Sequence, residues 1–134
     1  MTNELDKPRA LFDQIAHDLV ARHDGVTTGQ IAGLTSTALG KLKDTQIALL
    51  SSTQVGALNA TNFSALSSTA IGALTSTQLK GVTTGQISGL TSTALGNLKD
   101  TEIALLASTQ VGALNATNFS ALSATALGAL TSTQ

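Results

Sequence analysis

Residues 51–58 read SSTQVGAL, and this eight-residue unit decides the fold because units of the same form run without a break through residues 27–134. We call each unit an octad. Position 1 is usually Ser or Thr, position 5 is Ile, Leu, Val or Phe, and position 8 is Leu except at Val82. Position 3 is Thr except at Gly29 and Gly85. Such a fixed period is typical of a solenoid, in which each unit buries its apolar side chains against neighbouring units.

A second period of 56 residues, or seven octads, is superimposed on the first. Residues 26–78 and 82–134 are identical at 47 of 53 positions. The six differences are Ala32/Ser88, Lys41/Asn97, Gln46/Glu102, Ser51/Ala107, Ser68/Ala124 and Ile71/Leu127. We therefore divide the array into two near-identical blocks that start at residues 26 and 82, the second cut short. Because the last octad holds only four residues, we expect the chain to be a fragment of a longer array.

The N-terminal segment, residues 1–26, has a different composition and holds eight of the 15 charged side chains. Its apolar residues recur at helical spacing, Pro8 suits a first helical turn, and Gly25 suits a C-terminal stop. The pattern predicts an amphipathic helix over residues 5–24 that caps the first octad of the array.

Two secondary structures compete for the octad. In a helix, position 1 is the N-cap and a Gln or Glu at position 4 completes a capping box, while the preceding Leu and position 5 form a hydrophobic staple. In a strand, Thr and the apolar residue at position 5 point inward and Gly-Ala makes a corner. The Leu at position 8 breaks strand alternation, and Ala, Leu and Gln are better helix formers. We predict an all-α superhelix of short capped helices, with a β-solenoid as the alternative.

The helical frame assigns a role to most positions of the octad. Positions 5 and 8 should be buried, and positions 1, 2 and 4 should face solvent. The predicted core residues are Ile31, Leu34, Ile47, Leu50, Val55, Leu58, Phe63, Leu66, Ile87, Leu90, Val111, Leu114, Phe119 and Leu122. The predicted caps are Thr27, Thr35, Ser51, Ser67, Thr75, Thr83, Thr91 and Ser123. Lys43, Lys99 and Ala107 cannot cap, so Asp44 or Asp100 could move the cap by one residue.

Composition argues against several classes of partner. The formal net charge is -1 and 11% of residues are charged, so the chain lacks the positive field that binds nucleic acid. No run of about 18 apolar residues is present, so we predict no transmembrane segment. The chain has no cysteine, and its N-terminus lacks the apolar stretch of a secretory signal peptide.

We predict neither enzyme activity nor a catalytic, cofactor or metal site. Hydroxyl groups are abundant, but the two histidines, His17 and His23, both lie in the N-terminal segment, away from the repeated hydroxyls. Together with Asp13, Asp18 and Asp24 these histidines could be taken for metal ligands, but a solvated polar face on a capping helix explains them better.

The octad SSTQVGAL resembles the Thr/Gln/Leu-rich tandem arrays of very large bacterial surface or secreted proteins, in which L-T-T-x-Q-I-x-A-L recurs. The resemblance covers residues 27–134. It implies a spacer, stalk or adhesin-like scaffold at the bacterial surface or outside the cell, with no catalytic residues. The start L-T-x-x-Q-V also resembles the first helix of TAL-effector repeats, but their base-reading pair has no counterpart here, so DNA reading is not implied.

Three functions remain open from the sequence. The first is a structural scaffold, which acts through its length and regular polar surface. The second is a protein-binding or self-associating solenoid, with Lys41, Lys43, Asp44 and Lys80 marking one face, or with end-to-end or lateral contacts between copies. The third is ice binding by rows of Thr at position 3, a prediction that depends mostly on the strand alternative. Local hydrogen bonding is the other common use of such Thr residues.

Overall fold

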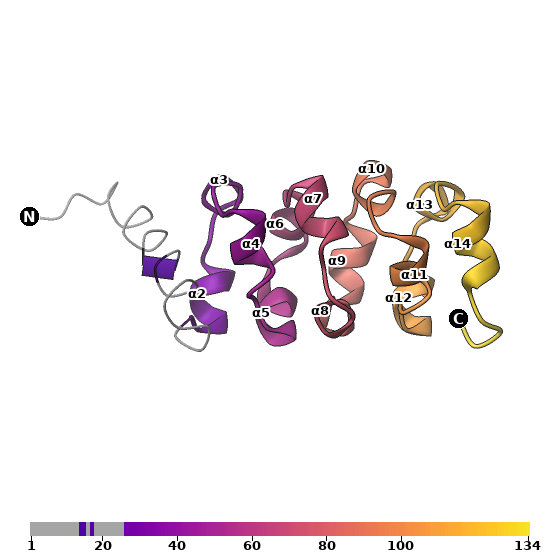
Figure 1. Ribbon diagram of the computed structural model, residues 1–134, viewed down its shortest axis with the longest axis horizontal. Coiled ribbons are helices and arrows are strands. Elements are labelled where there is room, and N and C mark those ends of the chain that lie inside the picture. The colour runs from indigo at the N-terminus through magenta and orange to yellow at the C-terminus, as the bar shows by residue number, and fades with distance from the viewer. Residues whose placement is uncertain (1–13, 16, 18–25) are drawn as a thin grey trace, which may run out of the picture.

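The computed structural model describes residues 14, 15, 17 and 26–134, and the array within them is entirely helical, with no strand (Figure 1). Thirteen short helices begin eight residues apart. They are α2 Thr28–Ala32, α3 Ser36–Leu39, α4 Asp44–Ile47, α5 Ser52–Ala57, α6 Ala60–Ser64, α7 Ser68–Gly72, α8 Ser76–Gly81, α9 Thr84–Ser88, α10 Ser92–Leu95, α11 Asp100–Ile103, α12 Ser108–Gly112, α13 Ala116–Ser120 and α14 Ala124–Ala129. The predicted all-α fold is confirmed, and the β-solenoid alternative is wrong.

Each helix begins at position 2 because position 1 is an extended N-cap residue. In α5, the hydroxyl of Ser51 accepts a hydrogen bond from the Gln54 N–H at 3.2 Å, and Gln54 Oε1 accepts one from the Ser51 N–H at 2.7 Å. These two bonds satisfy donors that a helix start otherwise leaves unpaired. The same side-chain cap is made by all eight residues named as caps, namely Thr27, Thr35, Ser51, Ser67, Thr75, Thr83, Thr91 and Ser123, and also by Asn59 and Asn115.

The proposed shift of the cap to an aspartate is wrong. Lys43 and Lys99 are the N-cap residues of α4 and α11, so Asp44 and Asp100 are the first helical residues. Neither lysine side chain makes a cap hydrogen bond, because an ammonium group can only donate. The Lys43 N–H still donates to Gln46 Oε1 at 2.8 Å. One of the two capping-box hydrogen bonds is therefore enough for these helices to begin at position 2, as the other helices do.

Position 8 ends three of the helices in extended backbone, at Leu58, Val82 and Leu130. In α5 the C-cap residue Leu58 has φ -64° and ψ 134°, and its N–H donates to the Val55 carbonyl at 3.2 Å. The next octad then starts in a new direction, and helices three apart in the chain pack together, as α2 on α5, α5 on α8 and α11 on α14. Three octads, or 24 residues, therefore make about one turn of an elongated superhelix (Figure 1).

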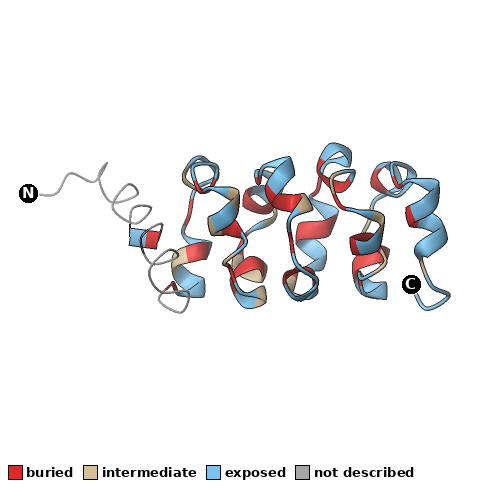
Figure 2. Cartoon of the chain, in the orientation of Figure 1, coloured by how far each residue is buried: buried red, intermediate tan, exposed pale blue. Residues whose placement is uncertain are grey.

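Positions 5 and 8 line the interior of this superhelix (Figure 2). Twelve of the 14 predicted core residues are buried. Phe119 is instead 44% exposed and Leu114 is half-buried, so the prediction for these two is wrong. Both belong to the last turn, residues 107–134, and within the described chain no further turn covers them.

The prediction of an N-terminal capping helix falls mostly outside the described residues. Gln14, Ile15 and His17 are helical, and Ile15 is fully buried in the core. His23, Asp13, Asp18 and Asp24 lie outside the described residues. No helix in the described part of the chain is long and apolar enough to cross a membrane.

Candidate functional surface

The side chain at position 4 links one turn of the superhelix to the turn before it. Gln86 is the clearest case, and it is 1% exposed. Its Oε1 accepts a hydrogen bond from the Thr83 N–H at 2.8 Å, which closes the capping box. Its Nε2 donates to the carbonyl of Val55 at 2.7 Å and to that of Leu58 at 2.6 Å, both in the preceding turn. One amide thus serves its own helix and the neighbouring turn at once.

This arrangement recurs along the array, and we call it the amide ladder. Its members donate from the side-chain amide to the carbonyl of the residue 28 positions earlier. They are Gln54, Asn62, Gln78, Gln86, Gln110, Asn118 and Gln134. All but Gln134 are buried, so the prediction that position 4 faces solvent is wrong. Burial is tolerated because every amide group finds a partner.

A second type of link appears where position 4 is alanine, which cannot donate. In the octads of Ala70 and Ala126, the N-cap serine binds the preceding turn instead. Ser67 Oγ donates to Asp44 Oδ1 at 2.6 Å, and Ser123 Oγ donates to Asp100 Oδ1 at 2.7 Å. The two aspartates therefore connect turns rather than cap helices.

The outer surface of the array is dominated by short hydroxyl side chains. Every Thr at position 3, from Thr37 to Thr133, is exposed, because this position lies on the side of each helix opposite the core. The helical fold removes the strand geometry on which the ice-binding prediction mostly depended. Ice binding stays a prediction, and a measurement of thermal hysteresis tests it.

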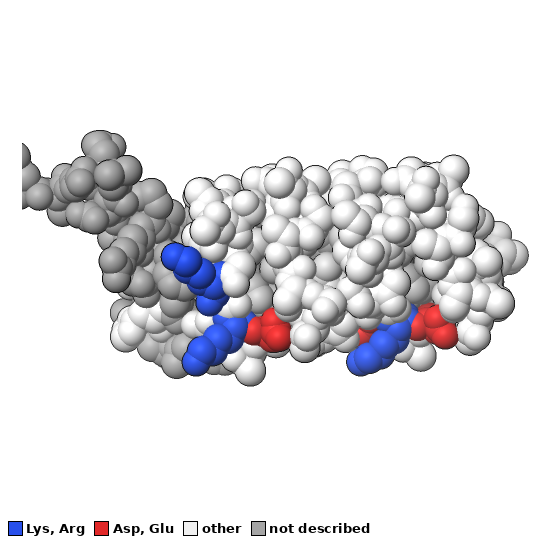
Figure 3. All heavy atoms as spheres, turned by 90° about the horizontal axis from the view of Figure 1, so that it is seen from above, with Lys and Arg blue, Asp and Glu red and all other residues white. Residues whose placement is uncertain are grey.

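Charged side chains gather at two places along one edge of the face seen in Figure 3, over the α4 and α11 parts of the chain, and most of that face is uncharged. Among the described residues, one salt bridge is present, with Lys99 Nζ 3.8 Å from Glu102 Oε1. Lys41 and Lys43 lie just before α4, whereas Lys80 lies in α8 beside a groove. The mixed signs give no broad attraction for a polyanion.

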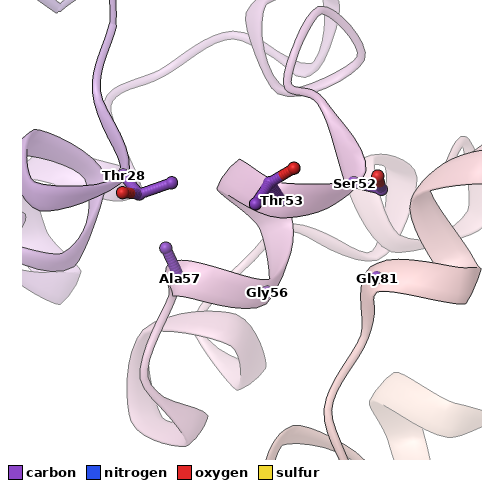
Figure 4. A pocket seen from close by; sticks show the side chains of 6 residues that line it. All are labelled: Thr28, Ser52, Thr53, Gly56, Ala57 and Gly81. Carbon is purple, nitrogen blue, oxygen red and sulfur yellow. The ribbon is translucent and has the colours of Figure 1, made fainter.

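One groove lies where glycines leave space between neighbouring helices. It has a volume of about 540 Å³ and is lined by Thr28, Ser52, Thr53, Gly56, Ala57 and Gly81 (Figure 4). The α5 and α8 backbones meet here so closely that a Cβ at Gly81 would lie 2.1 Å from the Ser52 carbonyl oxygen. The lining offers hydroxyl groups without a histidine or carboxylate to activate them.

No group of three His, Asp or Glu side chains that could hold a metal ion is present in the described part of the chain. What the surface offers is a regular set of hydroxyls, two small charged groups and shallow grooves. Comparison of the chain with models of known protein families, with curated proteins and with solved structures found no match.

Proposed function

We propose that this chain is a structural spacer, part of a larger bacterial surface or secreted protein, whose reach is set by its number of octads. The observation that carries this proposal is the packing between helices three octads apart, as between α2 and α5 and between α5 and α8. In such a superhelix, stability is close to a sum of nearest-turn contacts. Adding octads therefore lengthens the rod without a change in its interior.

The composition of the surface supports the same proposal. A spacer should not adhere to its surroundings. Exposed Ser or Thr residues recur in every octad, and most of the face seen in Figure 3 is uncharged. Bulky apolar side chains at the surface are few, namely Leu105, Phe119 and Leu127 among the described residues. Exposed apolar area of this kind is what normally drives nonspecific contacts.

The distance between two labels tests the proposal. Because the chain has no cysteine, Thr37→Cys and Thr117→Cys, both at exposed positions, provide two unique sites for dyes. Deleting residues 75–98 removes three octads in phase, and energy transfer should report a separation shorter by about 8–10 Å, the usual spacing of packed helices. Inserting a second copy of the same residues should lengthen it by the same step.

Two controls make this experiment decisive. Deleting residues 75–78 alone shifts the octad phase and should lower the helical signal in circular dichroism. Exchanging the six residues that differ between the blocks leaves the length unchanged and should leave the separation unchanged. A separation that does not follow the number of octads, or that changes with the block exchange, would contradict a spacer set by length.

A protein-binding solenoid is the second candidate, supported by the charged groups along one edge (Figure 3). A partner that docks there should bind in a fixed ratio to the chain. Its binding should be lost on Lys43→Ala and Lys99→Ala and kept on Lys80→Ala, since Lys80 borders a separate groove. Analytical ultracentrifugation of the chain with that partner measures the ratio and the loss.

A further inference from the structure

We infer that the superhelix contains a seam, the place where residues 91–106 meet the turn before them, and that the rod opens there first. Residues 91–106 hold α10 and α11. This inference goes beyond the spacer function and does not depend on it, since it concerns which turn-to-turn contact is weakest.

The seam is defined by the side-chain hydrogen bonds that join one turn to the next. From the second turn onward, the octads starting at residues 51, 59, 75, 83, 107, 115 and 131 use the amide ladder. The octads starting at residues 67 and 123 use the serine–aspartate bond. The octads starting at residues 91 and 99 have neither type of bond to the preceding turn. These two octads are neighbours in the chain. Because one turn holds three octads, two of the three octads at this point of the superhelix lack a side-chain hydrogen bond to the preceding turn.

In the octad that starts at residue 91, the side-chain bond to the preceding turn is missing because position 4 is alanine. Ala94 stands at position 4, where it cannot donate, and the alternative serine–aspartate bond is missing as well. Its N-cap residue Thr91 accepts the Ala94 N–H at 3.1 Å. Where the other alanine octads find an aspartate in the preceding turn, this octad finds Ser68 at the equivalent position of α7. The contact between α7 and α10 therefore relies on packing alone.

In the octad that starts at residue 99, the side-chain bond to the preceding turn is missing because position 4 is glutamate. Glu102 Oε2 accepts the Lys99 N–H at 2.8 Å, as Gln does in its own capping box. The other carboxylate oxygen takes the place of the amide nitrogen that Gln78 uses to reach the Leu50 carbonyl at 2.8 Å. A carboxylate has no proton to donate to the Leu74 carbonyl, 28 residues earlier. The side chain of Glu102 is only 10% exposed, so water does not easily replace the missing donor.

The surface at the seam fits a looser contact. A groove of about 290 Å³ borders the seam and extends past it to the start of α9 and to α12, lined among others by Lys80, Val82, Thr84, Leu105, Ala107 and Thr109. Leu105 is 47% exposed, the largest exposure of any large apolar side chain described. On the α7 side the seam is closed by close packing, since a Cβ at Gly72 would lie 2.9 Å from the Asn97 carbonyl oxygen. Packing without bonds allows the turns to separate and close again.

Hydrogen exchange of single backbone amides tests the seam. The amides of Leu95 and Ile103 donate within their own octads at 2.9 and 3.0 Å, the same lengths as those of Val55 and Ile87, which lie away from the seam. Local opening at the seam should nevertheless make the first pair exchange about tenfold faster than the second pair in the unmodified chain. Equal rates for the two pairs would overturn the inference.

The substitution Glu102→Gln restores the missing donor with almost no change in shape. It should slow exchange at Ile103 by about threefold to tenfold, the effect of one net hydrogen bond, and leave Val55 unchanged. Glu102→Met is the control for the loss of charge, because it adds no donor; it also removes the acceptor of the Lys99 N–H bond. If Glu102→Met slows exchange as much as Glu102→Gln, or if Glu102→Gln slows Val55 equally, the missing donor does not define a seam.

Discussion

The two blocks of the array have nearly the same sequence and yet hold their residues in different surroundings. Phe63 is 2% exposed, whereas its counterpart Phe119 is 44% exposed. A Cβ added at Gly56 would meet the Gly81 carbonyl oxygen at 2.6 Å, whereas one added at Gly112 would meet nothing within 4 Å. The difference lies in the turn that follows, which covers the first block and not the end of the second. An octad is thus stabilised by the octads 24 residues away more than by its own sequence.

The largest expected difference between the blocks is that between the two phenylalanines. Phe63→Ala should lower the free energy of unfolding by about 3–5 kcal/mol, because it leaves a cavity between two packed turns. Phe119→Ala should cost about 1 kcal/mol, because much of that ring already contacts water. Urea unfolding followed by circular dichroism measures both variants. Equal losses would mean that the following turn does not set the contribution of position 5.

Substitution of the glycines should change stability in opposite directions in the two blocks. Gly56→Ala places a methyl group against the backbone of α8 and should cost about 1–3 kcal/mol. Gly112→Ala has free space and a negative φ, so the better helix former should add about 0.5–1 kcal/mol. Thermal unfolding of the two single variants shows the sign directly. If both substitutions lower the stability of the chain, the loss arises within the octad itself and not from contact with the following turn.

The next comparison separates the two roles of the position 4 amide. Gln30 and Gln86 both close a capping box, but only Gln86 also donates to the preceding turn. Gln86→Met leaves the carbonyls of Val55 and Leu58 without that donor and should cost about 1–3 kcal/mol. Gln30→Met removes the capping-box bond alone and should cost about 0.5 kcal/mol. Similar midpoints in urea for the two variants would show that the amide ladder adds nothing to the cap.

The sequence was sufficient to predict the helix, its start and its buried positions, because these depend on bonds within one octad. Ser51 and Gln54 lie three residues apart, and their capping box can be read from that spacing. The bond from Gln54 to the preceding turn could not be read in this way, because its partner Val26 lies 28 residues earlier. One signal was present: position 4 is always Gln, Asn, Ala or Glu, whereas positions 1 and 2 also hold Ser or Thr.

The number of octads in one turn of the superhelix could likewise not be predicted from the sequence pattern. It depends on the direction in which the chain leaves each helix, as at Leu58, and on how closely α5 and α8 can approach. The exposure of Phe119 follows from the same geometry, since its octad matches that of Phe63 in every residue. Bonds between distant octads, such as that between Ser67 and Asp44, become predictable once the period of 24 residues is known.

The smallest expected effect is that of the one N-cap difference between the blocks. Ser51 caps α5 through its hydroxyl, whereas Ala107 at the start of α12 has no side-chain acceptor. Ala107→Ser should therefore add about 0.5–1 kcal/mol, and Ser51→Ala should cost a similar amount, since each changes one cap bond at an exposed helix start. The double variant that carries both changes should unfold close to the unmodified chain. A net loss in the double variant would show that a cap is worth more where the following turn holds its helix, as it does for α5.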